Sequence, residues 1–173
     1  MTIRKTISVL LVCSTIGILL YYFLPITKIP NKITVDKILV FKSKHELLVY
    51  SKNKLIVTYK IAIRKNPVGA KKYDGDLKTP EGLYIICSKN TNSGYHKNLG
   101  ISYPNKEDIQ NAKELRRPTG GDIKIHGLKN GQGWIGKFLR WRDWTNGCIA
   151  LTDEELDELY QHTPIGTSIE IRK

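Results

Sequence analysis

Hydrophobic and polar positions divide the chain into one long apolar run and a series of short alternating runs. Residues 7–24 carry no charge and are rich in Leu, Ile and Val, which is typical of a segment that crosses a bilayer. Beyond residue 36 the apolar side chains recur in short β-branched runs, the pattern of half-buried strands. We predict strands over residues 37–41, 46–50, 55–63, 83–87, 123–125, 148–151 and 167–171.

Two short helices are predicted among these strands. Asn105 can cap a helix over residues 106–117, because acidic residues occupy its first turn and arginines its last. Thr152 begins a second helix, since Glu155 three positions later completes a capping box. The pattern as a whole therefore predicts a mostly β domain with two packing helices.

The chain divides into residues 1–25, a transmembrane anchor or signal segment, a linker over 26–36, and a folded domain over 37–173. We favour an uncleaved anchor, because the apolar run is longer than a usual signal core and no small-x-small cleavage pattern follows it. Aromatic residues at 21–23 suit a membrane interface, and Arg4 and Lys5 favour a cytoplasmic N-terminus. Export after signal cleavage is the alternative.

The chain is basic, with a formal net charge of +12. Such a charge suits an anionic neighbour, although an ordinary solvated basic surface explains it equally well. We expect no nucleic-acid partner, because no nucleic-acid-binding motif is present and the basic residues do not concentrate on one helix. The sequence does not fix the oligomeric state.

Three cysteines are present, at positions 13, 87 and 148. An odd, widely spaced set is no disulfide framework, and without a CxxC pair it gives no zinc site. We expect no metal or organic cofactor. Cys87 lies in an apolar strand and is predicted to be a packed core thiol. Cys148 is the remaining candidate for chemistry.

Cys148 and His126 form the most plausible pair of nucleophile and base. A cysteine attacks as its thiolate, and a neighbouring imidazole can take the thiol proton. The two residues are 22 positions apart, and each adjoins a predicted strand. Two such strands can present both side chains at one edge of a sheet.

The segments that hold this pair resemble the L,D-transpeptidase (YkuD-type) catalytic domain. The resemblance is carried by residues 121–127 (GDIKIHG), 143–149 (DWTNGCI), 79–84 (TPEGLY) and 99–104 (LGISYP). It extends over residues 37–172. It implies a β-rich α+β fold, a sandwich of mixed sheets with two short helices, preceded here by the transmembrane segment.

Three positions depart from the usual signature of that family, which is His-Gly, then Ser-His-Gly-Cys, then Arg two residues after the cysteine. Thr145 replaces Ser and keeps a hydroxyl, Asn146 replaces the second His, and Ala150 occupies the Arg position. His126 is therefore the only candidate base. Arg140 or Arg142 can supply the missing cation and bind carboxylates of the substrate, although a solvated loop face suits both equally well.

The resemblance implies an enzyme that acts on peptidoglycan stem peptides through a thioester. Cys148 is then the nucleophile and His126 the general acid and base, oriented by the carbonyl group of Gly127. Backbone amides around Asn146 and Gly147 stabilise the oxyanion.

The resemblance leaves the acceptor open. D-alanine is released, and an amine then takes the acyl group for cross-linking or wall attachment. An L,D-carboxypeptidase that uses water, and a catalytically silent wall-binding module, are the alternatives. The implied location is the bacterial cell membrane, single-pass, with the catalytic domain on the periplasmic or outer side. Core packing is the default for Trp134, Trp141 and Trp144, and Trp144 is the one most suited to the substrate groove together with Thr145.

Overall fold

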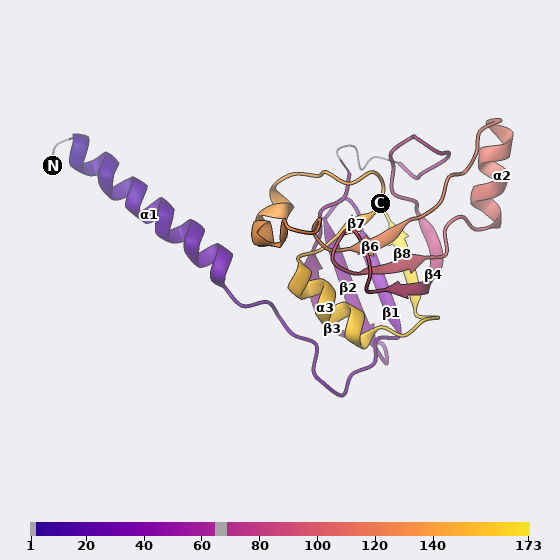
Figure 1. Cartoon of the computed structure of the whole chain (residues 1–173), viewed down its shortest axis with the longest axis horizontal. Coiled ribbons are helices and arrows are strands. Elements are labelled where there is room, and N and C mark those ends of the chain that lie inside the picture. The colour runs from indigo at the N-terminus through magenta and orange to yellow at the C-terminus, as the bar shows by residue number, and fades with distance from the viewer. Residues whose placement is uncertain (1–2, 65–68) are drawn as a thin grey trace.

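The computed structural model describes residues 3–64 and 69–173, as one long helix that projects from a β-rich body (Figure 1). The helix, α1 (Ile3–Phe23), has a mean hydropathy of 2.0 and none of its most apolar window is buried. By length and composition it can cross a membrane. The apolar run in the sequence thus forms a single helix that contacts the body only near its C-terminal end, among the residues that the structure describes.

The body is built on one sheet whose strand order is β3-β2-β1-β8-β4-β5-β6-β7. Its strands are β1 (Lys37–Phe41), β2 (Glu46–Ser51), β3 (Lys54–Lys60), β4 (Gly82–Asn90), β5 (Asn98–Ile101), β6 (Lys124–His126), β7 (Ile149–Ala150) and β8 (Ser168–Arg172). The pairs β1–β8 and β6–β7 are parallel and the others antiparallel. The expected mostly β fold with mixed strand directions is confirmed.

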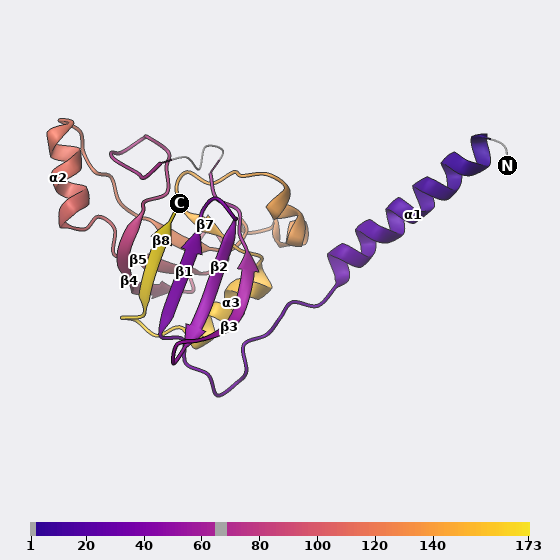
Figure 2. The ribbon, with the colours of Figure 1, turned by 180° about the vertical axis from the view of Figure 1, so that it is seen from behind.

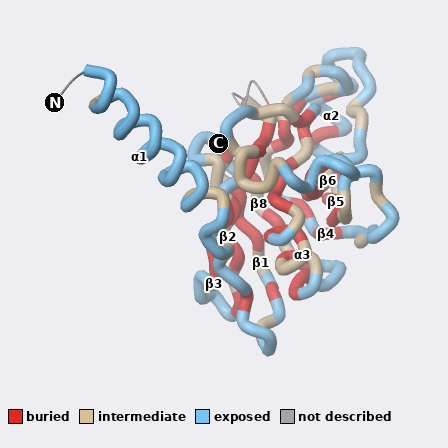
Figure 3. Tube along the Cα trace, turned by 60° about the vertical axis from the view of Figure 1, so that its left-hand side comes forward, coloured by how far each residue is buried: buried red, intermediate tan, exposed pale blue. Residues whose placement is uncertain are grey.

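The sheet curls at β4, which belongs to both of its halves. Residues 82–85 pair with β8, and residues from Ile86 onward pair with β5. The strands β1, β2, β3 and β8 thus form one layer, and β5, β6 and β7 turn away from it (Figures 1 and 2). Buried positions gather on the inner side of this curl (Figure 3), where Val40, Leu99 and Ile125 are fully enclosed.

Both predicted helices are present, with the predicted caps. α2 (Lys106–Glu114) and α3 (Asp153–His162) each begin with a complete capping box, on Asn105 and Thr152. α2 ends three residues before the predicted boundary, because Arg116 adopts a left-handed backbone with φ 53° that stops the helix. A third element, the 3₁₀ segment η1 (Gly133–Trp141), was not predicted.

Two expectations about buried side chains were wrong. Cys87 is exposed, because alternate residues of β4 face opposite sides and Tyr84 and Ile86 take the core side. Trp134 and Trp141 are 73% and 65% exposed rather than packed in the core. Both lie at the ends of η1, whose buried contact is made instead by Leu139.

The segment expected to be a linker is largely bound to the body. Ile29 and Val35 are 1% and 0% exposed and belong to the core. The Ile29 amide donates to the Glu158 carboxylate at 3.1 Å, and the Val35 amide donates to the His162 carbonyl at 2.9 Å. The chain is therefore fixed to α3 from Ile29 onward.

Candidate active site

Two neighbouring strands hold the candidate base and nucleophile. β6 ends at His126, and β7 begins directly after Cys148; the strands are parallel, with Ile125 opposite Ile149. These two isoleucines are fully buried on the core side. Because side chains alternate along a strand, His126 and Cys148 both belong to the opposite face. The local pattern of apolar residues thus brings the two groups to one surface.

The His126 imidazole is held in one tautomer. Its Nδ1 lies 2.7 Å from the carbonyl oxygen of Gly127, and a carbonyl only accepts, so Nδ1 carries the hydrogen. Nε2 is then the free basic nitrogen. The ring is 7% exposed and lies between Tyr95, at 4.9 Å between ring centroids, and Trp144, at 5.6 Å.

The Cys148 thiol is half-buried and donates to the carbonyl oxygen of Asp122 at 3.6 Å. Within residues 3–64 and 69–173, this is the acceptor of the thiol, and no thiol–imidazole hydrogen bond is formed. Sγ and the imidazole nevertheless line the same cavity, of about 380 Å³. The thiol and the imidazole therefore line one cavity without a hydrogen bond between them.

Burial keeps both groups neutral. Desolvation lowers the pKa of His126, with a further small contribution from the Lys124 ammonium, while the Gly127 carbonyl opposes it. Desolvation also raises the pKa of the Cys148 thiol, and the hydrogen bond from the backbone of Lys124 offsets this in part. At neutral pH the pair is thus a thiol and an imidazole, not a thiolate and an imidazolium.

A hydroxyl group clamps the loop in front of the thiol. The Thr145 side chain is buried; its Oγ1 donates to the Cys148 carbonyl at 2.7 Å and accepts from the Gly147 amide at 3.4 Å. Gly147 has φ +119°, and a Cβ there would lie 2.7 Å from the Lys78 carbonyl oxygen. Only glycine fits this position without strain. Asn146, between them, is exposed and lines the cavity.

Asp143 ties the start of this loop to the body. Its carboxylate accepts from the Ile63 amide at 2.9 Å and lies 2.8 Å from His45 Nε2. The amides of Trp144 and Thr145 both donate to the Ile63 carbonyl, at 2.9 and 3.1 Å. Residues 143–145 of the loop are therefore bonded to Ile63 and His45 before the chain reaches the thiol.

The predicted site residues divide into two groups. Trp144, Thr145 and Asn146 line the cavity with His126 and Cys148. The two arginines do not. Arg140 pairs with the buried Glu155 carboxylate of α3, and Arg142 is exposed outside the cavity lining.

Several residues of the cavity wall were not predicted from the sequence. Asp122 and Lys124 form an ion pair of 2.6 Å beside the thiol. The sequence could have indicated both, because they lie in the motif around His126, and Lys124 is on the same face of β6 as His126. Tyr95 comes from a loop without a pattern. It reaches the site because its carbonyl accepts from the Gly127 amide at 3.3 Å.

Comparison with known proteins agrees with this geometry. Residues 35–171 match the model of the YkuD family, the L,D-transpeptidase catalytic domain. The chain is 30% identical over 129 residues to the Escherichia coli K12 protein named "Putative L,D-transpeptidase YafK", covering 70% of this chain and 44% of that protein. It is 29% identical over 135 residues to "Putative L,D-transpeptidase YqjB" of Bacillus subtilis, covering 76% and 68%.

Solved structures give the same fold. The helical cell shape determining protein Pgp2 of Campylobacter jejuni superposes with a TM-score of 0.61 and 27% identity, over 82% of this chain and 49% of Pgp2. An L,D-transpeptidase of Mycobacterium smegmatis superposes with a TM-score of 0.54 at 11% identity, over 79% of this chain and 58% of that one. The chain spans about half the length of Pgp2 and less than half of YafK. On its sequence match and its fold, the chain belongs to the YkuD family of L,D-transpeptidase catalytic domains.

Proposed function

We propose that this protein is a cysteine-dependent acyltransferase that acts on the stem peptides of peptidoglycan, with Cys148 as nucleophile and His126 as general acid and base. The observation that carries the proposal is the shared cavity, which is lined by one thiol, one imidazole of fixed tautomer and residues 144–146 of the turn that precedes the thiol. Membership of the family supplies the substrate class.

The first step begins from the neutral pair. Sγ leaves the Asp122 carbonyl, and its proton passes to Nε2 of His126 as sulfur attacks the carbonyl carbon before the terminal D-alanine. A carbon–sulfur bond forms and the carbonyl oxygen becomes an oxyanion. Amides of residues 146–148 stabilise that charge. The Gly147 amide is available for this role because its bond to Thr145 is long, at 3.4 Å.

Collapse of the oxyanion breaks the carbon–nitrogen bond and leaves a thioester on Cys148. The imidazolium gives its proton to the departing amine of D-alanine, which restores the neutral base. An acceptor then loses a proton to Nε2 as it attacks the thioester. The carbon–sulfur bond breaks, and the imidazolium returns that proton to the departing sulfur, which restores the neutral thiol and imidazole. An amine acceptor gives a cross-link or a wall attachment, and water gives a shortened stem peptide.

The missing arginine after the cysteine leaves a cation to be supplied from elsewhere. Arg140 is committed to Glu155, whereas Lys124 lines the cavity and is 31% exposed. We therefore assign the recognition of a stem-peptide carboxylate to Lys124, once its partner Asp122 is displaced. Asp122 is 81% exposed, so the cost of separating the pair is small.

The location follows from α1. We infer that this helix is retained as a single-pass anchor, with the body on the periplasmic or outer side of the bacterial cell membrane. The support is its length and hydropathy together with Arg4 and Lys5 in its first turn. Intact-mass measurement on protein from a membrane fraction tests this inference, since a cleaved signal would remove the mass of α1.

The test of the reaction is incubation of the full chain in detergent with disaccharide-tetrapeptide, with products identified by mass. Loss of D-alanine with a cross-linked dimer indicates transpeptidation, and loss with a tripeptide product indicates use of water. Cys148→Ala should abolish both, while Cys87→Ala, which removes an exposed thiol outside the cavity, should change neither. Turnover that persists in Cys148→Ala would refute the mechanism. A wild type that binds substrate without turnover would identify a wall-binding module.

A further inference from the structure

The segment η1 is bound directly to the last turn of α1. The Lys137 ammonium donates to the carbonyl of Tyr21 at 3.3 Å and also to that of Leu24. A lysine is suited to this place because the last carbonyls of a helix lack partners and carry partial negative charge. From the helix side, the Tyr22 hydroxyl donates to the carbonyl of Trp134 at 2.5 Å.

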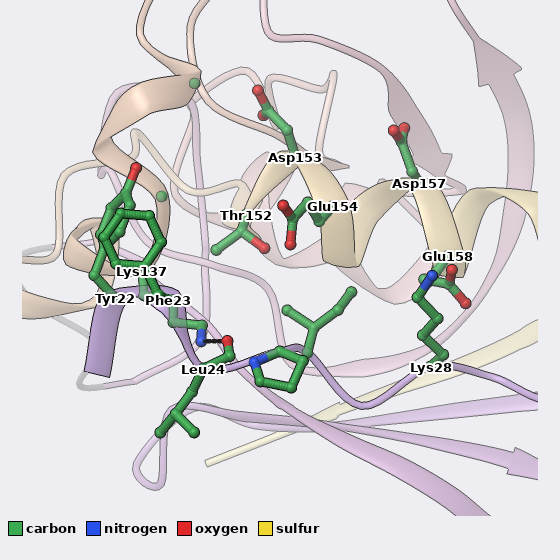
Figure 4. A pocket seen from close by; sticks show the side chains of 14 residues that line it. Tyr22, Phe23, Leu24, Lys28, Lys137, Thr152, Asp153, Glu154, Asp157 and Glu158 are labelled. Carbon is green, nitrogen blue, oxygen red and sulfur yellow. Dashed lines mark hydrogen bonds between the residues drawn. The ribbon is translucent and has the colours of Figure 1, made fainter. Parts of the chain in front are cut away.

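Aromatic side chains fill the contact between the two elements. The ring of Phe138 lies 6.3 Å from that of Tyr21 and 5.2 Å from that of Tyr22, and Trp141 stacks on Tyr21 at 6.3 Å. Gly136 allows the approach, because a Cβ there would lie 3.0 Å from the Tyr22 ring. Figure 4 shows Tyr22 and Lys137 together at one end of a cavity of about 790 Å³ that α3 closes on the other side. The contact is thus specific in both hydrogen bonds and shape.

Large apolar groups at this contact are also exposed to solvent. Trp134, Trp141 and Phe23 are 73%, 65% and 73% exposed. Two exposed cations, Lys129 and Arg142, lie just outside the two ends of η1. Large aromatics that face water beside basic residues are characteristic of a surface that meets a lipid headgroup layer.

We propose that η1 lies in the lipid–water interface of the membrane that α1 crosses, and so seats the catalytic domain on the bilayer surface. The proposal rests on the inferred anchor, because the end of a spanning helix marks the depth of the interface. η1 is held at that depth by the Lys137 and Tyr22 contacts. Tryptophan is enriched at this depth, where its ring meets acyl chains and its N–H meets headgroups.

The packing of η1 extends to the candidate active site. Ile135 and Leu139 of η1 pack in one apolar cluster with Trp144, and Trp144 borders the His126 imidazole. A fixed position of η1 on the membrane therefore fixes the orientation of the cavity relative to the bilayer.

Quenching by brominated lipid tests the proposal on the full chain. Wild type and the double variant Trp134→Phe/Trp141→Phe are reconstituted in vesicles of phosphatidylcholine and phosphatidylglycerol, with and without bromine on the acyl chains. The variant changes two largely exposed positions, keeps an aromatic ring beside Tyr21 at position 141, and retains Trp144 as its single indole. Bromine is expected to reduce the emission of the wild type and to leave the emission of the variant unchanged. Flotation of the vesicles at alkaline pH reports separately whether α1 anchors the chain.

Each other result overturns the proposal. Protein that floats with the vesicles but shows no quenching keeps the anchor and removes η1 from the interface. Equal quenching of wild type and variant moves the lipid contact to Trp144. If the emission is unquenched and the protein forms a concentration-dependent dimer, the exposed aromatic residues Phe23, Trp134 and Trp141 bind a second copy of the chain instead of lipid. Protein that does not float ends the anchor and this inference together.

Discussion

Replacing Thr145 with valine removes one hydroxyl from the turn in front of Cys148 and keeps the shape of the side chain. That hydroxyl donates to the Cys148 carbonyl at 2.7 Å and accepts from the Gly147 amide at 3.4 Å. Thr145 is only 5% exposed, so water cannot readily replace the lost group. The variant therefore tests whether the clamp on the turn positions the nucleophile.

The expected size follows from these two bonds. A buried polar group left without its partner costs about 1–3 kcal/mol, and the shorter bond to Cys148 accounts for most of this. If the turn relaxes in the free enzyme and must be restored in the transition state, a cost of about 2 kcal/mol corresponds to about a 30-fold loss in kcat/KM. The free energy of unfolding should fall by a similar or smaller amount.

The assay is release of D-alanine from disaccharide-tetrapeptide, measured alongside denaturant unfolding of each variant. Thr145→Ser is the matched control, because it keeps the hydroxyl and should retain most of the activity. Valine and serine variants of equal activity would refute the positioning argument. So would a valine variant whose loss is explained entirely by its unfolded fraction.

Three further predictions concern Gly147 of the turn, the Arg140–Glu155 ion pair and the Cys148 thiol. Gly147→Ala should lower stability by about 1–3 kcal/mol and reduce turnover, as followed by unfolding and D-alanine release, because its φ is +119° and a backbone carbonyl lies 2.7 Å from the new Cβ; unchanged values would contradict this. Arg140→Gln should lower the free energy of unfolding by about 3 kcal/mol, because it leaves the buried Glu155 carboxylate without its cation, and turnover per folded molecule should change little. A selective rise in KM would instead show that Arg140 binds the substrate. The rate of Cys148 alkylation by iodoacetamide should keep rising at pH values above 9.0, the ordinary pKa of a cysteine thiol, because burial raises the pKa of Cys148. Peptide mass spectrometry measures this rate, with Cys87 as the internal reference, and a rate that levels off at neutral pH would refute the neutral resting pair.

Most strands and both helix caps were predictable because their signals are local, whereas β5 (Asn98–Ile101) was not predicted. Alternation at β6 and the capping box on Thr152 depend on neighbouring residues alone. The segment η1 was not predictable in this way, since a 3₁₀ segment broken at Gly136 has no sustained helical period. Its residues are placed by the end of α1 and by Trp144, which are distant in sequence.

The site was predictable in part for the same reason. His126 and Cys148 stand beside strands whose apolar residues fix their facing, so their approach could be anticipated. The role of Arg140 could not, because its partner Glu155 is assigned only when α3 packs against η1. The wrong expectation for Cys87 came from treating an apolar strand as buried on both faces, whereas only one face of β4 meets the core.

Because Ile29 is attached to α3, the connection between α1 and the folded body is very short. Between Phe23, where α1 ends, and Ile29, where the chain enters the core, there are only five residues. Even fully extended, this stretch reaches about 20 Å. Under the proposed anchor and substrate, the cavity therefore reaches only the layer of cell wall nearest the membrane, whatever its affinity for glycan strands farther out.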